Sequence, residues 1–161
     1  MEIREEYMRR ALQLAAMGQG RVSPNPMVGA VIVCDGKIIG EGYHRQWGGP
    51  HAEVNAVASV ADKTKLSRST MYVTLEPCSH YGKTPPCAEL IIKNGIPRVV
   101  VGAMDPFEKV RGRGVDMSRK AGVDVVTGVL EKECEELNKH FMTAHKSGRP
   151  FVLLKWAESN D

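Results

Sequence analysis

The sequence lacks the features that mark a membrane, secreted or nucleic-acid-binding protein. No apolar run approaches the roughly 20 residues that a membrane span needs. The opening stretch, MEIREE, is too acidic and too mixed for a signal peptide. Lys and Arg number 22 against 19 Asp and Glu, and a net charge of +3 is too small to predict a nucleic-acid partner. We therefore expect a cytoplasmic protein that has neither a membrane nor a nucleic acid as partner.

Aromatic residues and cysteines are also few. Aromatic residues make up 6% of the 161 residues, which leaves little for stacking a flipped nucleic-acid base. The four cysteines occur without a secretion signal, so metal ligands or unpaired thiols are expected rather than a disulfide framework. The length suits one domain with an apolar core of its own.

Strand-like and helix-like segments alternate along the chain. Predicted strands cover 27–34, 37–43, 70–75, 97–103 and 123–126, and predicted helices cover 7–15, 52–60, 87–93, 115–121 and 130–145. Asp35-Gly36 predicts a tight hairpin turn between the first two strands. This order favours an α/β layered fold that opens with a hairpin and continues with parallel strands. A last strand-like run, 150–156, has no later partner in sequence and suggests that a second domain once followed.

Three potential metal ligands stand where predicted elements begin or end. His51 precedes the helix 52–60, Cys78 follows the strand 70–75, and Cys87 opens the helix 87–93 after two prolines. One imidazole and two thiolates are a set that zinc prefers, and three protein ligands leave the fourth tetrahedral position open for water. A cysteine at a helix N-terminus is also favoured as the thiolate. The spacing therefore predicts a catalytic zinc site.

Glu53 lies two residues after His51, so the two side chains diverge on a helix and cannot easily reach one ion. We interpret Glu53 as the proton carrier, because zinc lowers the pKa of a bound water to about 7 and a nearby carboxylate can take and return its proton. A single His or Cys is usually structural, and Cys34, Cys134, His140 and His145 are interpreted in that way.

The combination of these motifs resembles the cytidine-deaminase-like zinc hydrolases, whose signature is His-x-Glu followed by Pro-Cys-x-x-Cys. Eight residues separate the two cysteines here, and this longer loop looks like the deaminase domain of riboflavin-biosynthesis enzymes that act on a diaminohydroxyphosphoribosylaminopyrimidine. Further matches to that family are SPNPMVG (23–29), GYH (42–44), GPHAE (49–53) and EPCSH (76–80). The resemblance extends from about Tyr7 to Trp156.

The resemblance implies a fold, a reaction and a set of site residues. The fold is a three-layer α/β/α sandwich with a five-stranded mixed sheet. The reaction is hydrolytic removal of an amino group from the pyrimidine, which leaves a ring carbonyl. His51, Cys78 and Cys87 carry over as ligands of one zinc ion per chain, with Glu53 as the catalytic residue. The positions that carry over as substrate-binding are Asn25, His44, His80, Lys83 and Asp105.

Two features depart from the family pattern. The family usually has Asp-Pro-Asn-Pro before a glycine-containing stretch, and Phe107 occupies the Asn position here. Arg111 and Arg113 either assist with phosphate or are simply solvated, and the sequence does not decide between these alternatives. The family's deaminase is also commonly fused to a reductase that uses NADPH. We interpret 1–146 as the deaminase domain and 147–161 as a linker with the first strand of that reductase, so NADPH is expected only with the missing domain.

Two other functions stay open. A nucleoside or transfer-RNA adenosine or cytidine deaminase would share the His-x-Glu and Pro-Cys motifs, although the long loop and small charge disfavour it. A structural zinc module that binds a partner would need a fourth protein ligand, for which His80 is the nearby candidate, and would leave Glu53 unused. We also expect a homo-oligomer, because the apolar residues 151–154 would otherwise be exposed.

Overall fold

A five-stranded mixed sheet forms the centre of the protein in the computed structural model, which describes residues 2–159. The strands are β1 (Gly29–Cys34), β2 (Lys37–Tyr43), β3 (Thr70–Leu75), β4 (Arg98–Ala103) and β5 (Asp124–Val126). Their order across the sheet is β2-β1-β3-β4-β5. β1 runs antiparallel to both β2 and β3, whereas β3, β4 and β5 are parallel. The predicted hairpin, mixed sheet and strand positions are confirmed.

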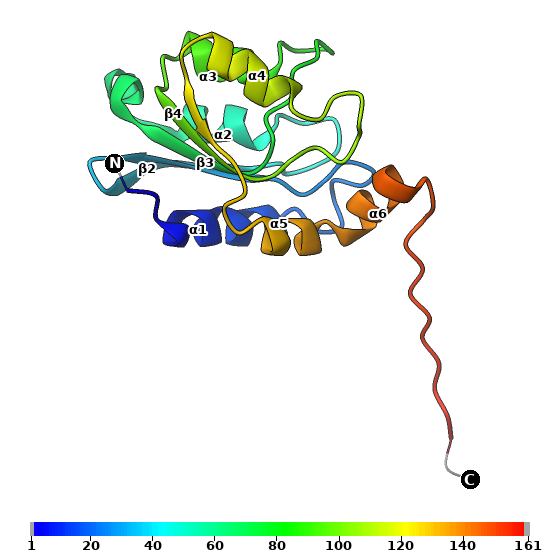
Figure 1. Ribbon diagram of the computed structural model, residues 1–161. Helices are drawn as coiled ribbons and strands as arrows, with labels where there is room; N and C mark the ends of the chain where they lie inside the picture. Colours follow the sequence, from blue (N-terminus) through cyan, green and yellow to red (C-terminus); the bar gives the residue numbers. More distant parts are fainter. Residues whose placement is uncertain (1, 160–161) are drawn as a thin grey trace.

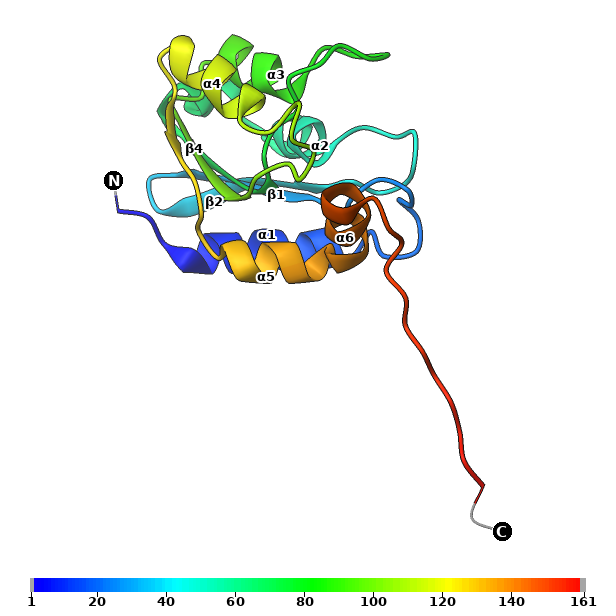
Figure 2. The same cartoon turned by 45° about the vertical axis from the view of Figure 1, so that its right-hand side comes forward.

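Helices cover both faces of this sheet, as Figures 1 and 2 show. On one face lie α1 (Glu5–Ala16), α5 (Glu131–Leu137) and α6 (Lys139–Ser147). On the other lie α2 (Ala52–Ser59), α3 (Cys87–Lys93) and α4 (Arg113–Lys120). A short 3-10 helix, η1 (Lys63–Arg68), precedes β3 and was not predicted. The three-layer α/β/α sandwich expected from the resemblance is therefore present.

The central strands β1 and β3 are buried along their whole length because helices cover both faces of the sheet. In β1, Val31 and Val33 pack in the cluster formed with α1, whereas Ala30 and Ile32 pack in the cluster formed with α2. Burial on both faces explains why β1 is an apolar run and why β3 is apolar apart from its two threonines, rather than alternating with charged residues.

Two glycines let helices approach the hairpin closely. A Cβ atom on Gly29 would lie 1.9 Å from the Ala11 carbonyl oxygen of α1. A Cβ atom on Gly42 would lie 2.3 Å from the Ala56 nitrogen of α2. Any side chain at either position would therefore force the helix and the strand apart.

The predicted long helix 130–145 is wrong in one respect, because it is two helices that meet at Asn138. This residue has φ −108° and ψ 32°, which is not helical. Its side chain instead bonds to the backbone of Met27, on a loop far away in sequence. A tertiary contact thus ends α5 and starts α6, and helical periodicity alone does not reveal it.

The strand predicted at 150–156 is also wrong for this structure. The described part of this segment carries no helix or strand, and it extends away from the sandwich (Figure 1). Val152, Leu153, Leu154 and Trp156 are exposed. The five-stranded sheet of the described residues does not include this segment. Among the described residues, no helix is long and apolar enough to cross a membrane.

The topology gathers four loops at one edge of the sheet. Because β1 is antiparallel to β2 and β3, the loop before β1 and the loops after β2 and β3 meet there. The loop after β4 joins them, since β4 is parallel to β3. These loops carry Asn25, His44, Cys78 and Asp105.

Candidate active site

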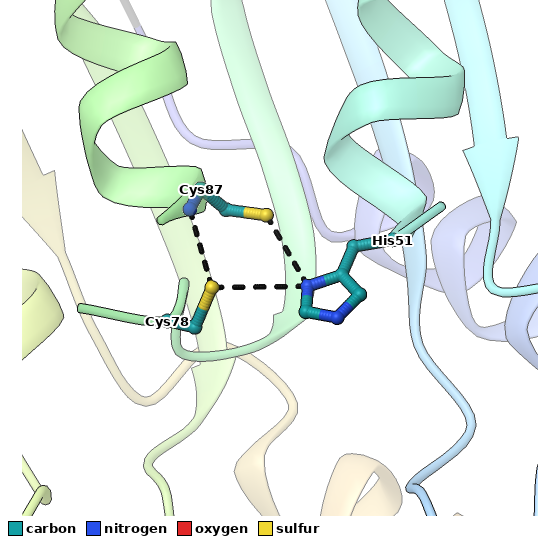
Figure 3. Close-up of side chains that lie close together, drawn as sticks. All are labelled: His51, Cys78 and Cys87. Carbon is teal, nitrogen blue, oxygen red and sulfur yellow. Dashed lines mark hydrogen bonds between the residues drawn. The ribbon is translucent and has the colours of Figure 1, made fainter. Parts of the chain in front are cut away.

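The three predicted metal ligands converge at this edge from separate elements. His51 is the residue that caps the N-terminus of α2, and Cys87 is the first residue of α3. Cys78 lies on the loop between β3 and α3. The backbone N–H of Cys87 donates a hydrogen bond to Cys78 Sγ at 3.2 Å, which ties that loop to the start of α3 (Figure 3).

The spacing of the ligand atoms suits a tetrahedral zinc ion. His51 Nδ1 lies 3.7 Å from Cys78 Sγ and 3.4 Å from Cys87 Sγ, and the three side chains point toward one another in Figure 3. Zinc bonds of about 2.3 Å to sulfur and 2.0 Å to nitrogen, at the tetrahedral angle, separate sulfur from nitrogen by about 3.5 Å. The two distances bracket that value, so these residues fit zinc.

The same three residues are the one group of potential ligands found among residues 2–159. Their ligand atoms all lie within 4.8 Å of one another. His80, the candidate fourth ligand of a structural zinc site, is not in the group. Cys34 and Cys134 are buried elsewhere, which agrees with the structural role expected for both thiols.

The electrostatics of the cysteine pair favour one thiolate. The pKa of Cys78 is lowered to about 4, first by a hydrogen bond from the Cys87 side chain and then by His51. The pKa of Cys87 is raised, because its proton is held by Cys78 and its thiol is buried. The pKa of His51 is raised by its hydrogen bond with Cys78. A thiolate is the form of cysteine that binds metal.

Glu53 lies in the first turn of α2 with 4% of its surface exposed. Burial raises its pKa to about 7, and the negative charge of Cys78 adds to the effect. Glu53 lines the same cavity as His51 and Cys78, which has a volume of about 240 Å³. A carboxyl group with this pKa can both accept and donate a proton near neutral pH.

Four of the five predicted substrate residues line that cavity together with Glu53. They are Asn25, His44, His80 and Asp105. The fifth, Lys83, lines an adjoining cavity of about 360 Å³. Asn25, His51, Cys78 and His80 belong to both cavities, so the two are contiguous. The structure therefore brings the five predicted residues to two adjoining cavities, and their role as substrate contacts stays a prediction.

A chain of hydrogen bonds orients Asn25. The buried His44 ring places Nδ1 3.0 Å from the Pro50 carbonyl oxygen. Because that oxygen can only accept, Nδ1 carries the proton and donates it. His44 Nε2 is then left to accept from Asn25 Nδ2, at 3.3 Å. The Asn25 carboxamide therefore keeps its oxygen available as an acceptor for another group.

Asp105 is positioned by its own loop and by Glu76. The Phe107 N–H donates to Asp105 Oδ1 at 2.8 Å, and the Asp105 N–H donates to Glu76 Oε1 at 3.2 Å. The Phe107 side chain is 46% exposed and lines neither cavity. The departure from the family pattern at residue 107 therefore adds no aromatic side chain to the lining of either cavity. Arg111 and Arg113 are exposed and line neither cavity.

Phe141 is a cavity residue that the sequence did not reveal. It belongs to α6 and lines the 240 Å³ cavity together with the predicted residues. In the sequence, Phe141 is one apolar residue among several in a helical segment. No motif or turn marks it.

The chain belongs to the cytidine and deoxycytidylate deaminase family, because the model of that family's zinc-binding region matches residues 1–103. The match includes His51, Glu53, Cys78 and Cys87.

The chain is also similar to proteins named for riboflavin biosynthesis. It is 50% identical to the riboflavin biosynthesis protein RibD of Aquifex aeolicus over 160 residues, which is 99% of this chain and 44% of that protein. It is 47% identical to the diaminohydroxyphosphoribosylamino-pyrimidine deaminase of Buchnera aphidicola, covering 89% of this chain and 97% of that protein. The chain thus spans less than half of RibD but nearly all of the Buchnera deaminase.

Solved structures agree with this assignment. A diaminohydroxyphosphoribosylaminopyrimidine deaminase/5-amino-6-(5-phosphoribosylamino)uracil reductase from Thermotoga maritima matches with a TM-score of 0.86 and 52% identity. The match covers 91% of this chain and 42% of that chain. A RibD structure from Acinetobacter baumannii matches with a TM-score of 0.87 and 44% identity, and that match covers 91% of this chain and 41% of the RibD chain. The cytidine-deaminase-like fold predicted from the resemblance is confirmed.

Proposed function

We propose that this chain catalyses hydrolytic deamination of a diaminohydroxyphosphoribosylaminopyrimidine in riboflavin biosynthesis. The observation that carries the proposal is the placement of the buried Glu53 in one cavity with His51 and Cys78. The names of the Buchnera and Thermotoga relatives support the choice of substrate.

The protein residues that would hold zinc are His51, Cys78 and Cys87. Bound zinc supplies a water that is activated for attack at neutral pH. Three protein ligands leave room for such a water, whereas a closed structural site needs four. This ligand number supports an enzyme rather than a structural zinc module.

Glu53 moves the protons of the reaction. Water adds its oxygen to the ring carbon that carries the amino group, and Glu53 carries a proton from that water to the adjacent ring nitrogen. Glu53 then carries the remaining hydroxyl proton to the amine, the carbon–nitrogen bond breaks, and ammonia leaves while the ring carbon becomes a carbonyl. Since Glu53 returns each proton that it takes up, the reaction consumes one water and leaves the enzyme unchanged.

The cavity residues suit a polar pyrimidine. The hydrogen bond to His44 uses Asn25 Nδ2, so the side-chain oxygen of Asn25 can accept a hydrogen bond from a ring amino group. Asp105 and His80 line the same cavity and can bond to the ribosyl hydroxyls or ring edge. Lys83, in the adjoining cavity, is suited to the phosphate. In this proposal the ring lies beside Glu53 and the phosphate lies beside Lys83.

The remaining interpretations are part of the same proposal. We infer that 1–146 is the deaminase domain and that 147–161 begins a connection to a reductase, which the name of the Thermotoga relative supports. Formation of a homo-oligomer stays a prediction, supported by the exposed apolar residues 152–154.

Ammonia release by the zinc-loaded chain tests the proposal. The substrate panel contains the phosphoribosylamino-pyrimidine, its dephosphorylated form, cytidine and an adenosine-containing RNA hairpin. We expect release from the first compound, weaker release from the second and none from the last two. Release from cytidine or the hairpin in place of the first compound would contradict the proposed substrate.

A further inference from the structure

Asn138, the residue between α5 and α6, has a buried side chain with an unusual pair of partners. It is 5% exposed, and the Met27 N–H donates to its Oδ1 at 2.8 Å. Its Nδ2 donates to the Met27 carbonyl oxygen at 2.7 Å. Both backbone groups of Met27 are thus paired by one side chain, as a neighbouring strand would pair them. We call this contact the Asn138–Met27 pair.

Each residue of the Asn138–Met27 pair lies close in sequence to a residue that lines the 240 Å³ cavity beside Glu53. Asn25 lies two residues before Met27 and lines that cavity. Phe141 lies three residues after Asn138, about one helical turn on, and lines it as well. The Asn138 carbonyl also accepts the hydrogen bond from Met142 N, at 2.8 Å, in the first turn of α6. One buried amide therefore connects two walls of the cavity.

The two walls offer complementary contacts. Asn25 presents a carboxamide oxygen, whereas Phe141 presents an aromatic ring that also packs on His145, with ring centroids 4.2 Å apart. A flat, polar heterocycle is recognised by hydrogen bonds at its edge and apolar contact on its face. The distance between Asn25 and Phe141 therefore decides how well such a ring fits.

We propose that Asn138 is a positioning residue for substrate recognition, and that Phe141 contacts the face of the pyrimidine ring. Asn138 touches no substrate atom itself. It holds the loop of Asn25 and the start of α6 at a fixed separation. This inference rests on the proposed function for the identity of the ring.

The metal ligands and Glu53 are supported by other elements. His51 and Glu53 belong to the start of α2, and Cys87 belongs to α3, which lie on the opposite face of the sheet from α5 and α6. Loss of the Asn138–Met27 pair should therefore weaken substrate binding while leaving the chemical step intact. In kinetic terms, KM rises and kcat is kept.

The kinetic test compares Asn138→Asp with Asn138→Ala. The Asp variant has the same shape as Asn but turns an oxygen toward the Met27 carbonyl, so it removes the hydrogen bond that Nδ2 donates. It leaves no cavity, so it keeps the test valid if the Ala variant fails to fold. Asn94→Asp is the matched control. Asn94 Nδ2 donates to the Leu90 carbonyl at 2.8 Å, and Asn94 lines neither the 240 Å³ nor the 360 Å³ cavity.

We expect KM to rise about tenfold or more in both Asn138 variants, with kcat within about threefold of wild type and zinc content unchanged. Phe141→Leu should raise KM in the same direction. Asn94→Asp should lower thermal stability and leave KM unchanged. An unchanged KM in the Asn138 variants, or a fall in kcat without a change in KM, would overturn the proposal.

A second measurement needs no turnover. In Asn138→Ala, the backbone amide of Met27 should exchange with solvent faster, and the NMR signals of the Asn25 side-chain amide should shift. Unchanged Asn25 signals would show that Asn138 does not position that loop. A wild-type chain that releases no ammonia would count against the proposed function, and the NMR measurement would still decide the role of Asn138.

Discussion

Replacing Glu76 by Gln should destabilise the loop that carries Asp105. The Glu76 carboxylate is 7% exposed and accepts four backbone hydrogen bonds. Oε1 accepts from Asp105 N at 3.2 Å and Gly112 N at 3.0 Å. Oε2 accepts from Gly114 N at 3.0 Å and Val115 N at 3.2 Å. One side chain thus pairs the loop after β4 with the start of α4.

The magnitude follows from the loss of two acceptors. A Gln at this position keeps one oxygen and turns an NH₂ group toward two backbone N–H groups, which leaves both without a partner. Each buried donor left unpaired costs about 1–3 kcal/mol. We therefore expect the free energy of unfolding to fall by about 4 kcal/mol, a large part of the 5–15 kcal/mol that is usual. The melting temperature should fall by roughly 10 °C.

Denaturant unfolding followed by circular dichroism measures this loss. Glu41→Gln is the matched control, because Glu41 pairs with Arg10 at the surface, with 31% and 41% of the two side chains exposed. The control should lose under about 1 kcal/mol. A loss below about 1 kcal/mol for Glu76→Gln would show that the four hydrogen bonds to Glu76 contribute little to stability.

Three further predictions concern packing, substrate and pH. Gly42→Ala should cost about 3 kcal/mol in unfolding free energy, because the new Cβ would lie 2.3 Å from the α2 backbone, whereas Gly82→Ala, which meets nothing within 4 Å, should cost little. Lys83→Ala should raise KM for the phosphorylated substrate but not for its dephosphorylated form, and equal effects on both would contradict a phosphate contact. The pKa of Glu41 is lowered by its hydrogen bond from Arg10, so the stability that the pair contributes is present at neutral pH and is lost as pH falls through that lowered pKa. The difference in unfolding free energy between wild type and Arg10→Met should therefore shrink below about pH 4, and a constant difference would argue against the ion pair.

The fold could be predicted wherever the sequence carries a local signal. Asp35 and Gly36 both have positive φ, as the central residues of the tight hairpin turn predicted by an Asp-Gly pair do. The bounds of β3 could be predicted because its segment is rich in β-branched and aromatic residues and carries no charge. The break at Asn138 was missed because its cause, the backbone of Met27, lies 111 residues away.

The candidate site likewise contains residues that the sequence reveals and residues that it does not reveal. His51, Cys78 and Cys87 could be found because zinc restricts the residue types and helix starts restrict their places. The role of Glu76, which lies in the EPCSH match, and the place of Phe141 in the cavity could not be found in this way. The partners of Glu76 are backbone N–H groups, which leave no mark in a sequence, and Phe141 reaches the cavity only through the packing of α6.

Glu53→Gln tests whether Glu53 carries the protons of the reaction, because it removes the carboxylate and keeps the size of the side chain. Zinc content and ammonia release would be measured on the same sample. We expect one zinc ion per chain in both proteins and a fall in turnover of about a thousandfold in the variant. Turnover that persists at the wild-type rate with zinc bound would contradict the assignment of Glu53 as the proton carrier.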